Sequence, residues 1–108
     1  MEEYRDYIND IIQQINFIEE FVVEMNIEEF IKDKKTQFAV IRCLEVVGEA
    51  VSKIPEEIKS EYPEIPWITI KNMRNRLIHG YFDLNIKIIW NTIEKDIPDL
   101  KQKITRIQ

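Results

Sequence analysis

Apolar residues recur every three or four positions in almost every segment of this chain, and no segment alternates cleanly between apolar and polar positions. Spacings of three and four place side chains on one face of an α-helix, whereas strict alternation would indicate a β-strand. The pattern predicts an all-α fold: an up-and-down bundle of four to five helices that forms a single domain over residues 1–108.

The first predicted helix covers residues 2–25 and has an unusually broad apolar face. A main stripe is widened by a second row of apolar positions, so the helix has room for two neighbours. These positions are Tyr4, Tyr7, Ile8, Ile11, Ile12, Ile15, Phe17, Ile18, Phe21 and Val22. A short helical piece is predicted to follow within residues 27–33.

The second long predicted helix has an apolar stripe that begins at Phe38 and ends just before Pro55. Gly48 lies in its middle, where glycine costs about 1 kcal/mol relative to alanine. A close crossing with another helix, next to Ala50, would account for a glycine there. Cys43 has no histidine nearby and is interpreted as a buried structural thiol.

The remainder of the chain predicts three further helical segments. A short helix follows Pro55, and a third long helix runs from Trp67 to Gly80, a good C-terminal stop. The last helix extends from about residue 86 to 107, with a kink or brief interruption near Pro98. Trp67 and Trp90 lie on apolar stripes, so we interpret them as core or interface anchors rather than as platforms for base stacking.

Composition narrows the class of protein. The 108 residues are 44% hydrophobic and 32% charged, which is typical of a soluble globular domain, and so short a chain gains stability from a partner subunit. There is no membrane-length apolar run, and the acidic start lacks the basic region of a signal peptide, so we expect a cytoplasmic protein. One cysteine and one histidine cannot build a four-ligand metal cage, so we expect chemistry without a metal or other cofactor.

Charge is unevenly distributed along the chain. The net charge is -5, but residues 1–33 carry -8 and residues 34–108 carry +3. Residues 71–81 contain no acid and include Lys71, Arg74, Arg76 and His79, so a phosphate could approach there. The alternative is that these cations form an ordinary solvated helix face.

His79 is the only histidine, and an imidazole is the side chain whose ordinary pKa lies near neutrality. On a regular helix Asn75 lies about 40° from His79, whereas Arg74 lies about 140° away. The two could share a substrate if the arginine swings round, if the helix ends at Gly80, or if two subunits assemble the site. We favour the last arrangement.

Arginine and histidine together suit RNA cleavage without a metal. Arg74 would bind phosphate oxygens, with Lys71 and Arg76 as further phosphate contacts, and His79 would transfer the proton of a hydroxyl. RNA carries its own nucleophile, the 2′-hydroxyl, which DNA lacks. A two-fold dimer would supply the second imidazole that such a reaction requires.

Each of these residues also has an ordinary structural interpretation. His79 could cap a helix C-terminus, and Tyr81 could be a packing residue. Glu45 and Glu49, four positions apart, could be extra acid–base groups, although such a pair is more often a solvated face.

The chain resembles the HepT-like toxins of the HEPN superfamily. Arg74, Asn75, His79, Gly80 and Tyr81 reproduce that family's Arg-x4-His-x-Tyr pattern. The stretches LEVVGEAVSKIPEEIK, IPWITIKNMRN and IIWNTIEKDIPDLKQKI also look like the family, so the resemblance covers essentially the whole chain.

The resemblance implies a helical homodimer that acts as a metal-independent endoribonuclease toxin, with Arg74 and His79 catalytic and Asn75 assisting. It also implies a partner, a small nucleotidyltransferase antitoxin that transfers AMP to Tyr81. An adenylate there would place negative phosphate where the RNA phosphate should bind. Two alternatives remain from the residues: a non-catalytic module that binds a nucleotide or the nucleotidyltransferase, and a purely structural helical dimer.

Overall fold

The computed structural model describes residues 3–78 and 85–107, and the regular structure in those residues is entirely helical. The elements are α1 (Glu3–Phe21), α2 (Ile27–Lys32), α3 (Lys34–Ser52), α4 (Glu56–Glu61), α5 (Trp67–Ile78), α6 (Ile86–Asn91), the π-helical segment η1 (Thr92–Asp96) and α7 (Ile97–Ile104). The predicted all-α fold is confirmed. Its described part consists of α1, α3, α5 and the continuous α6–η1–α7 helix, together with the two short helices α2 and α4.

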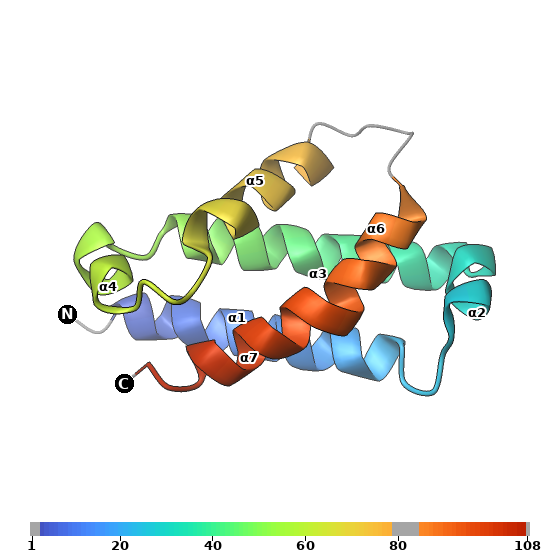
Figure 1. Ribbon diagram of the computed structural model, residues 1–108, viewed down its shortest axis with the longest axis horizontal. Helices are drawn as coiled ribbons and strands as arrows, with labels where there is room; N and C mark the ends of the chain where they lie inside the picture. Colours follow the sequence, from blue (N-terminus) through green and yellow to red (C-terminus); the bar gives the residue numbers. More distant parts are fainter. Residues whose placement is uncertain (1–2, 79–84, 108) are drawn as a thin grey trace.

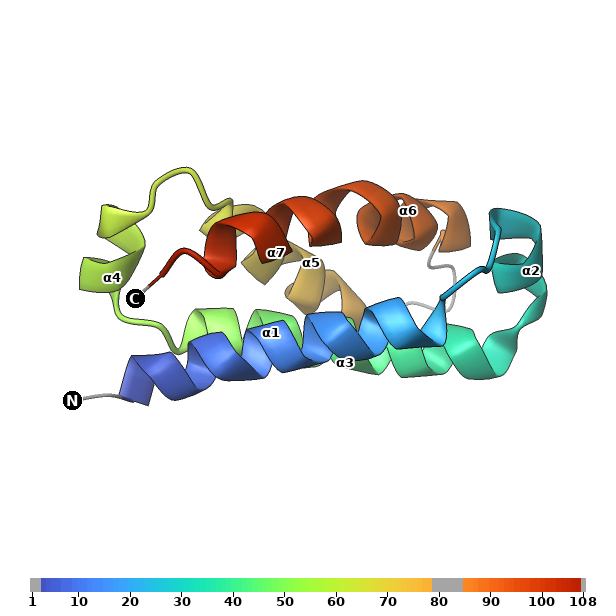
Figure 2. The same ribbon diagram turned by 90° about the horizontal axis from the view of Figure 1, so that it is seen from below.

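The helices form two layers (Figures 1 and 2). α1 and α3 run antiparallel, side by side along the long axis, while α5 and the α6–α7 helix lie across them. The short helices α2 and α4 sit at opposite ends of the molecule. In the part of the chain that the structure describes, no helix has the length and apolar character needed to cross a lipid bilayer.

The first helix packs against both α3 and α7, as its broad apolar face predicts. Phe17 and Phe21, which are predicted to widen that face, are instead 38% and 43% exposed. The helix ends earlier than predicted, however, at Phe21. The backbone then turns: Met25 donates its N–H to the carbonyl of Val22 (2.9 Å), and Glu24 adopts a positive φ of 61°. A left-handed residue cannot continue a right-handed helix, so the turn releases the chain toward α2.

The start of α3 also differs from the predicted apolar stripe. Phe38 is 69% exposed, whereas its polar neighbour Gln37 is buried. The Gln37 side-chain amide donates to the carbonyls of Phe30 (2.8 Å) and Ile31 (2.9 Å) near the end of α2. The Phe30 carbonyl also accepts from the N–H of Asp33, the residue that caps α2 (3.2 Å). Carbonyls in the last turn of a helix lack their usual partners, so their bonds to Gln37 outweigh the burial of Phe38.

The predicted disturbance near Pro98 is confirmed as one turn of π-helix. Ile97 donates its N–H to the carbonyl of Thr92, five residues earlier. Proline has no N–H and its ring crowds the carbonyl four residues before it, and the wider turn accommodates this without breaking the helix. Ile93, Ile97 and Leu100 therefore all remain buried.

The interpretation of both tryptophans as core anchors is confirmed. Trp90 is 7% exposed, and its ring lies 5.1 Å from that of Phe30. Trp67 is buried at the start of α5, and its indole N–H donates to the carbonyls of Lys59 (3.2 Å) and Tyr62 (3.1 Å). These bonds tie the first turn of α5 to α4.

Candidate functional site

Helix α5 carries most of the candidate site, and its packing decides where each polar side chain goes. Trp67, Ile70 and Leu77 are its buried residues and face the core. On the helical wheel Arg74 lies within this buried face, between Ile70 and Trp67, so its stem must pack against another helix. Lys71, Asn75 and Arg76 lie outside the face, toward its edges or solvent.

Gly48 of α3 allows α5 to approach closely at the position of Arg74. A Cβ atom on Gly48 would overlap the Cβ atom of Arg74 and lie 2.6 Å from its Cγ atom. The predicted close crossing at Gly48 is thus confirmed, with α5 as the partner helix. The stem of Arg74 rests directly on the α3 backbone, so its guanidinium must lie along the surface of α3.

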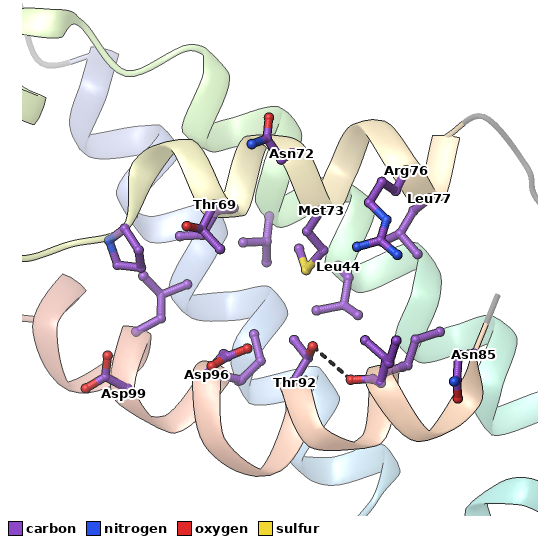
Figure 3. Close-up of a pocket in the computed structure, with 17 residues that line it drawn as sticks. Leu44, Thr69, Asn72, Met73, Arg76, Leu77, Asn85, Thr92, Asp96 and Asp99 are labelled. Carbon is purple, nitrogen blue, oxygen red and sulfur yellow. Dashed lines mark hydrogen bonds between the residues drawn. The ribbon is translucent and has the colours of Figure 1, made fainter.

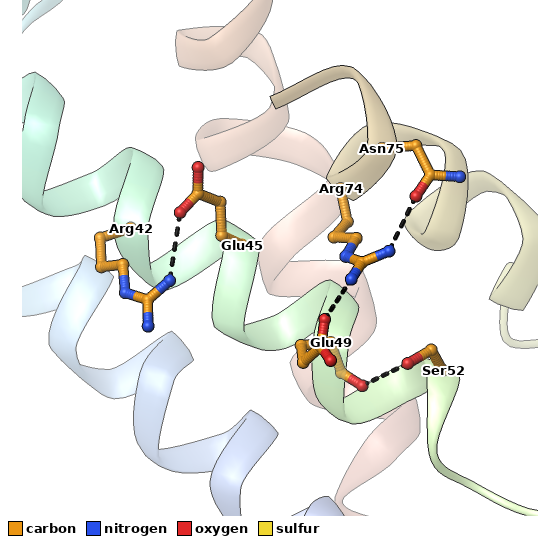
Figure 4. Close-up of polar contacts among 6 residues, drawn as sticks. All are labelled: Arg42, Glu45, Glu49, Ser52, Arg74 and Asn75. Atoms are coloured by element: carbon orange, nitrogen blue, oxygen red, sulfur yellow. Dashed lines mark hydrogen bonds and ion pairs between the residues drawn. The ribbon is translucent and has the colours of Figure 1, made fainter. Parts of the chain in front are cut away.

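Two side chains hold the Arg74 guanidinium (Figure 4). Nη2 forms a short ion pair with the Glu49 carboxylate of α3, and Nη1 donates to Oδ1 of Asn75 (2.9 Å). Nε is buried and has no hydrogen-bond partner within residues 3–78 and 85–107. The Arg74 side chain is 25% exposed and that of Glu49 is 46% exposed, so the pair is open to solvent on one side.

Lys71 and Arg76 differ in their relation to Arg74. Lys71 is exposed and lies about 60° from Arg74 around the helix, on the same flank. Arg76 lies about 160° away and points toward a separate cavity on the other flank (Figure 3). The structure therefore places only Lys71 on the side of Arg74.

The cavity beside Arg76 lies between α5 and the α6–α7 helix and has a volume of about 460 Å³. Its walls are largely apolar and include Leu44, Met73 and Ile88. Asp96 and Asp99 line it from the C-terminal helix, toward the other end of the cavity from Arg76 (Figure 3). An apolar cavity with acids on its wall is a poor place for an RNA phosphate.

His79 and Tyr81 lie outside the described residues, as does Gly80. Their roles therefore stay predictions from the sequence. Ile78 is the last described residue of α5, so the motif continues directly from the helix that carries Arg74 and Asn75.

Glu49 is the contact of Arg74 that the sequence pattern does not reveal. The sequence leaves Glu45 and Glu49 either as extra acid–base groups or as a solvated pair, and Glu45 does pair locally with Arg42 (3.3 Å). Glu49 instead reaches across to α5. The available signal was Gly48: a mid-helix glycine marks the crossing, and the next residue is well placed to meet the crossing helix.

Cys43 conforms to its structural interpretation. Its thiol is 5% exposed, and burial raises the pKa of that thiol, with nearby Arg42 opposing the shift. A raised pKa keeps the sulfur protonated and weakens it as a nucleophile.

The family model and the individual relatives that match this chain are all described as ribonucleases. The family model described as "Ribonuclease HepT-like" matches residues 11–107. The chain is similar to "Probable ribonuclease HepT" of Thermococcus cleftensis, with 48% identity over 97% of this chain and 96% of the relative. It is also 44% identical to "Putative RNase MJ0127" of Methanocaldococcus jannaschii, over 93% of this chain and 84% of that protein. No solved structure gives a significant match.

Proposed function

The chain belongs to the HepT-like ribonuclease family, and we propose that it is a metal-independent endoribonuclease that acts as the toxin of a toxin–antitoxin pair. The observation that supports this best is the placement of Arg74. Its stem is fixed against Gly48 and its guanidinium lies partly exposed at the surface, next to the residues that lead to His79. A guanidinium so placed can meet a phosphate at once, without first leaving the core.

The proposed reaction uses the substrate's own 2′-hydroxyl as the nucleophile. The 2′-oxygen attacks the adjacent phosphorus as a base takes its proton, and the P–O5′ bond breaks as an acid protonates the leaving oxygen. Arg74 stabilises the charge that develops on the phosphoryl oxygens, and His79 transfers a proton. The products are a 2′,3′-cyclic phosphate and a 5′-hydroxyl.

A homodimer completes this scheme. One imidazole per chain supplies one proton-transfer group, so a second copy would provide the other across a shared cleft. Asn75 would orient Arg74, to which it is hydrogen bonded. Lys71 and Arg76 remain proposed phosphate contacts, with Lys71 the better placed because it shares the flank of Arg74.

The first experiment is RNA cleavage by the purified protein in EDTA, with the product ends identified by mass. Wild-type protein should leave 2′,3′-cyclic phosphates, and Arg74→Ala and His79→Ala should each abolish cleavage. Arg42→Ala is the matched control, since it removes a surface arginine whose ion pair within residues 3–78 and 85–107 is with Glu45 of the same helix. Cleavage that persists in both site variants would rule out this site.

Regulation by a nucleotidyltransferase antitoxin is proposed for Tyr81. The adenylate would bring a negative phosphate close to His79 and Arg74, where it would occupy the place of the RNA phosphate. Intact-mass measurement after co-expression with a neighbouring nucleotidyltransferase should show added AMP groups. Tyr81→Phe should remove them, and an unchanged mass for wild-type protein would contradict the proposal.

A non-catalytic binding module is the second candidate, and the net charge of -5 favours it. Such a charge weakens nonspecific RNA binding at physiological salt. Under this alternative the protein binds the nucleotidyltransferase but leaves RNA intact, so the cleavage assay separates the two functions.

A further inference from the structure

The ion pair between Glu49 and Arg74 joins two helices at the closest point of their crossing. Glu49 follows Gly48 directly in α3, and Gly48 is the residue on which the Arg74 stem rests. The carboxylate therefore meets the far end of the same side chain whose near end is fixed by the glycine. Arg74 is held at both ends by consecutive residues of one helix.

The remaining contacts of Arg74 restrict it less. Asn75 is its immediate neighbour on α5, so that hydrogen bond moves with the helix rather than tying the guanidinium to another element. Nε is buried but makes no hydrogen bond within the described residues. A long arginine side chain has many rotamers, and the carboxylate of α3 is the contact that selects one of them.

We propose that Glu49 is a positioning residue for the reaction: it holds the Arg74 guanidinium at the surface in the orientation that receives the scissile phosphate. This inference rests on the proposed ribonuclease function. Glu49 binds Nη2 and Asn75 binds Nη1, while Nε is buried, so the N–H groups left for a substrate are the second donors of the two Nη atoms, on the exposed side of the guanidinium. Glu49 itself would repel the RNA phosphate, so it contributes to turnover and not to substrate affinity.

This role differs from that of a simple structural ion pair. A pair that only stabilised the α3–α5 contact would affect the free energy of unfolding and leave the turnover of folded protein unchanged. A positioning carboxylate lowers turnover without weakening RNA binding, because its removal releases the guanidinium and also removes a negative charge near the phosphate.

The test compares Glu49→Ala and Glu49→Gln with Glu45→Ala. Glu45 is the matched control because it lies one turn earlier on α3 and pairs with Arg42 instead of with α5. Glutamine keeps the shape and one acceptor oxygen, so it guards against a fold defect in the alanine variant. The full chain is used throughout, and each kcat is referred to the folded fraction.

We expect Glu49→Ala to lower kcat by about tenfold or more, the scale of a misplaced catalytic group, with KM unchanged or lower. Glu49→Gln should recover part of the loss, and Glu45→Ala should match wild-type protein. An unchanged or increased kcat in Glu49→Ala would overturn the inference, as would a rise in KM at constant kcat.

A second readout does not require catalysis. In protein labelled with ¹⁵N-arginine, the Arg74 Nη–H signals, which include the donor to Glu49, should exchange slowly with water in wild-type protein and in Glu45→Ala, and quickly in Glu49→Ala. Equal exchange in all three would overturn the positioning role. If wild-type protein cleaves no RNA, the proposed function fails, while this measurement still decides whether Glu49 orients Arg74.

Discussion

Two arginines of α5, only two positions apart, lie in different regions of the molecule. Arg74 meets α3 at the Gly48 crossing, where Glu49 and Asn75 hold its guanidinium. Arg76 is exposed and borders the apolar cavity between α5 and the C-terminal helix. Among the described residues, Arg74 forms an ion pair and Arg76 does not.

The difference shows that charge along the sequence is a weak guide to a phosphate site. Residues 71–81 are free of acids in sequence, yet the fold brings Glu49 to Arg74, and Asp96 and Asp99 to the cavity beside Arg76. Only the first of these arrangements fixes a cation at the surface. We therefore expect Arg74→Ala and Arg76→Ala to have different effects on RNA cleavage.

Arg74→Ala should have the largest effect. Removing a group that stabilises transition-state charge costs about 10²–10³ in kcat, so we expect a loss of that size in RNA cleavage. Unfolding by urea should show a small loss of stability, because the Arg74 stem packs against Gly48, whereas the partly exposed ion pair itself contributes little. A loss below tenfold in steady-state cleavage assays would contradict the proposed role.

Gly48→Ala tests how closely helix α5 approaches the backbone of α3 at their crossing. The added Cβ would overlap the stem of Arg74, so α5 must shift. Overpacking lowers the free energy of unfolding by about 1–3 kcal/mol, whereas replacing glycine with alanine in a helix raises it by about 1 kcal/mol. Because the overlapping atom is the Cβ atom of Arg74, whose position the backbone fixes, we expect a net loss of stability. Urea denaturation measures this change in the free energy of unfolding, and Ser52→Ala, at an exposed position of the same helix, is the control. Stability equal to or above that of wild-type protein would show that α3 and α5 pack less closely at Gly48 than the structure indicates.

Arg76→Ala should act on binding alone. As one phosphate contact is lost, KM should rise a few-fold and kcat should stay constant. The slope of the logarithm of the RNA-binding constant against the logarithm of the salt concentration should become shallower by about one. A fall in kcat comparable with that of Arg74→Ala would remove the distinction between the two regions.

Asp33 provides the smallest effect and a reference at the opposite end of α3 from the Gly48 crossing. The backbone N–H and the hydroxyl of Thr36 lower the pKa of this α3 N-cap from its ordinary value of 3.8. Its contribution to stability is therefore present above the unfolded pKa and is lost as the pH falls through the lower folded value. Asp33→Asn keeps a capping oxygen but does not titrate, so its urea midpoint should fall less steeply below pH 4. Identical pH profiles would contradict this assignment.

Much of the fold could be predicted because helix periodicity, glycine and proline act locally. The bundle, the breadth of α1, the crossing at Gly48 and the disturbance before Pro98 all follow from spacing. The error at Phe38 arose where a tertiary need prevailed over the local pattern, because Gln37 is buried to satisfy carbonyls of α2. The early end of α1 follows a local turn with a positive φ at Glu24, which the apolar spacing does not indicate.

Less of the candidate site could be predicted. The motif identified Arg74 and Asn75, but spacing within one helix does not reveal which carboxylate of another helix will meet the guanidinium. Glu49 and Arg74 are 25 residues apart, and their contact depends on how α3 and α5 cross. Grouping Arg76 with Arg74 followed from their shared charge, whereas the helix turns them to opposite flanks.

The central claim is that this chain cleaves RNA through the substrate's 2′-hydroxyl, with the fixed guanidinium of Arg74 meeting the phosphate. The most direct measurement is cleavage, in EDTA, of matched strands with ribose or with 2′-O-methylribose. Only the ribose strand should be cut, leaving a 2′,3′-cyclic phosphate, and Arg74→Ala should cut it about 10²–10³-fold more slowly. Cleavage of the methylated strand, or full activity in the variant, would rule out this mechanism.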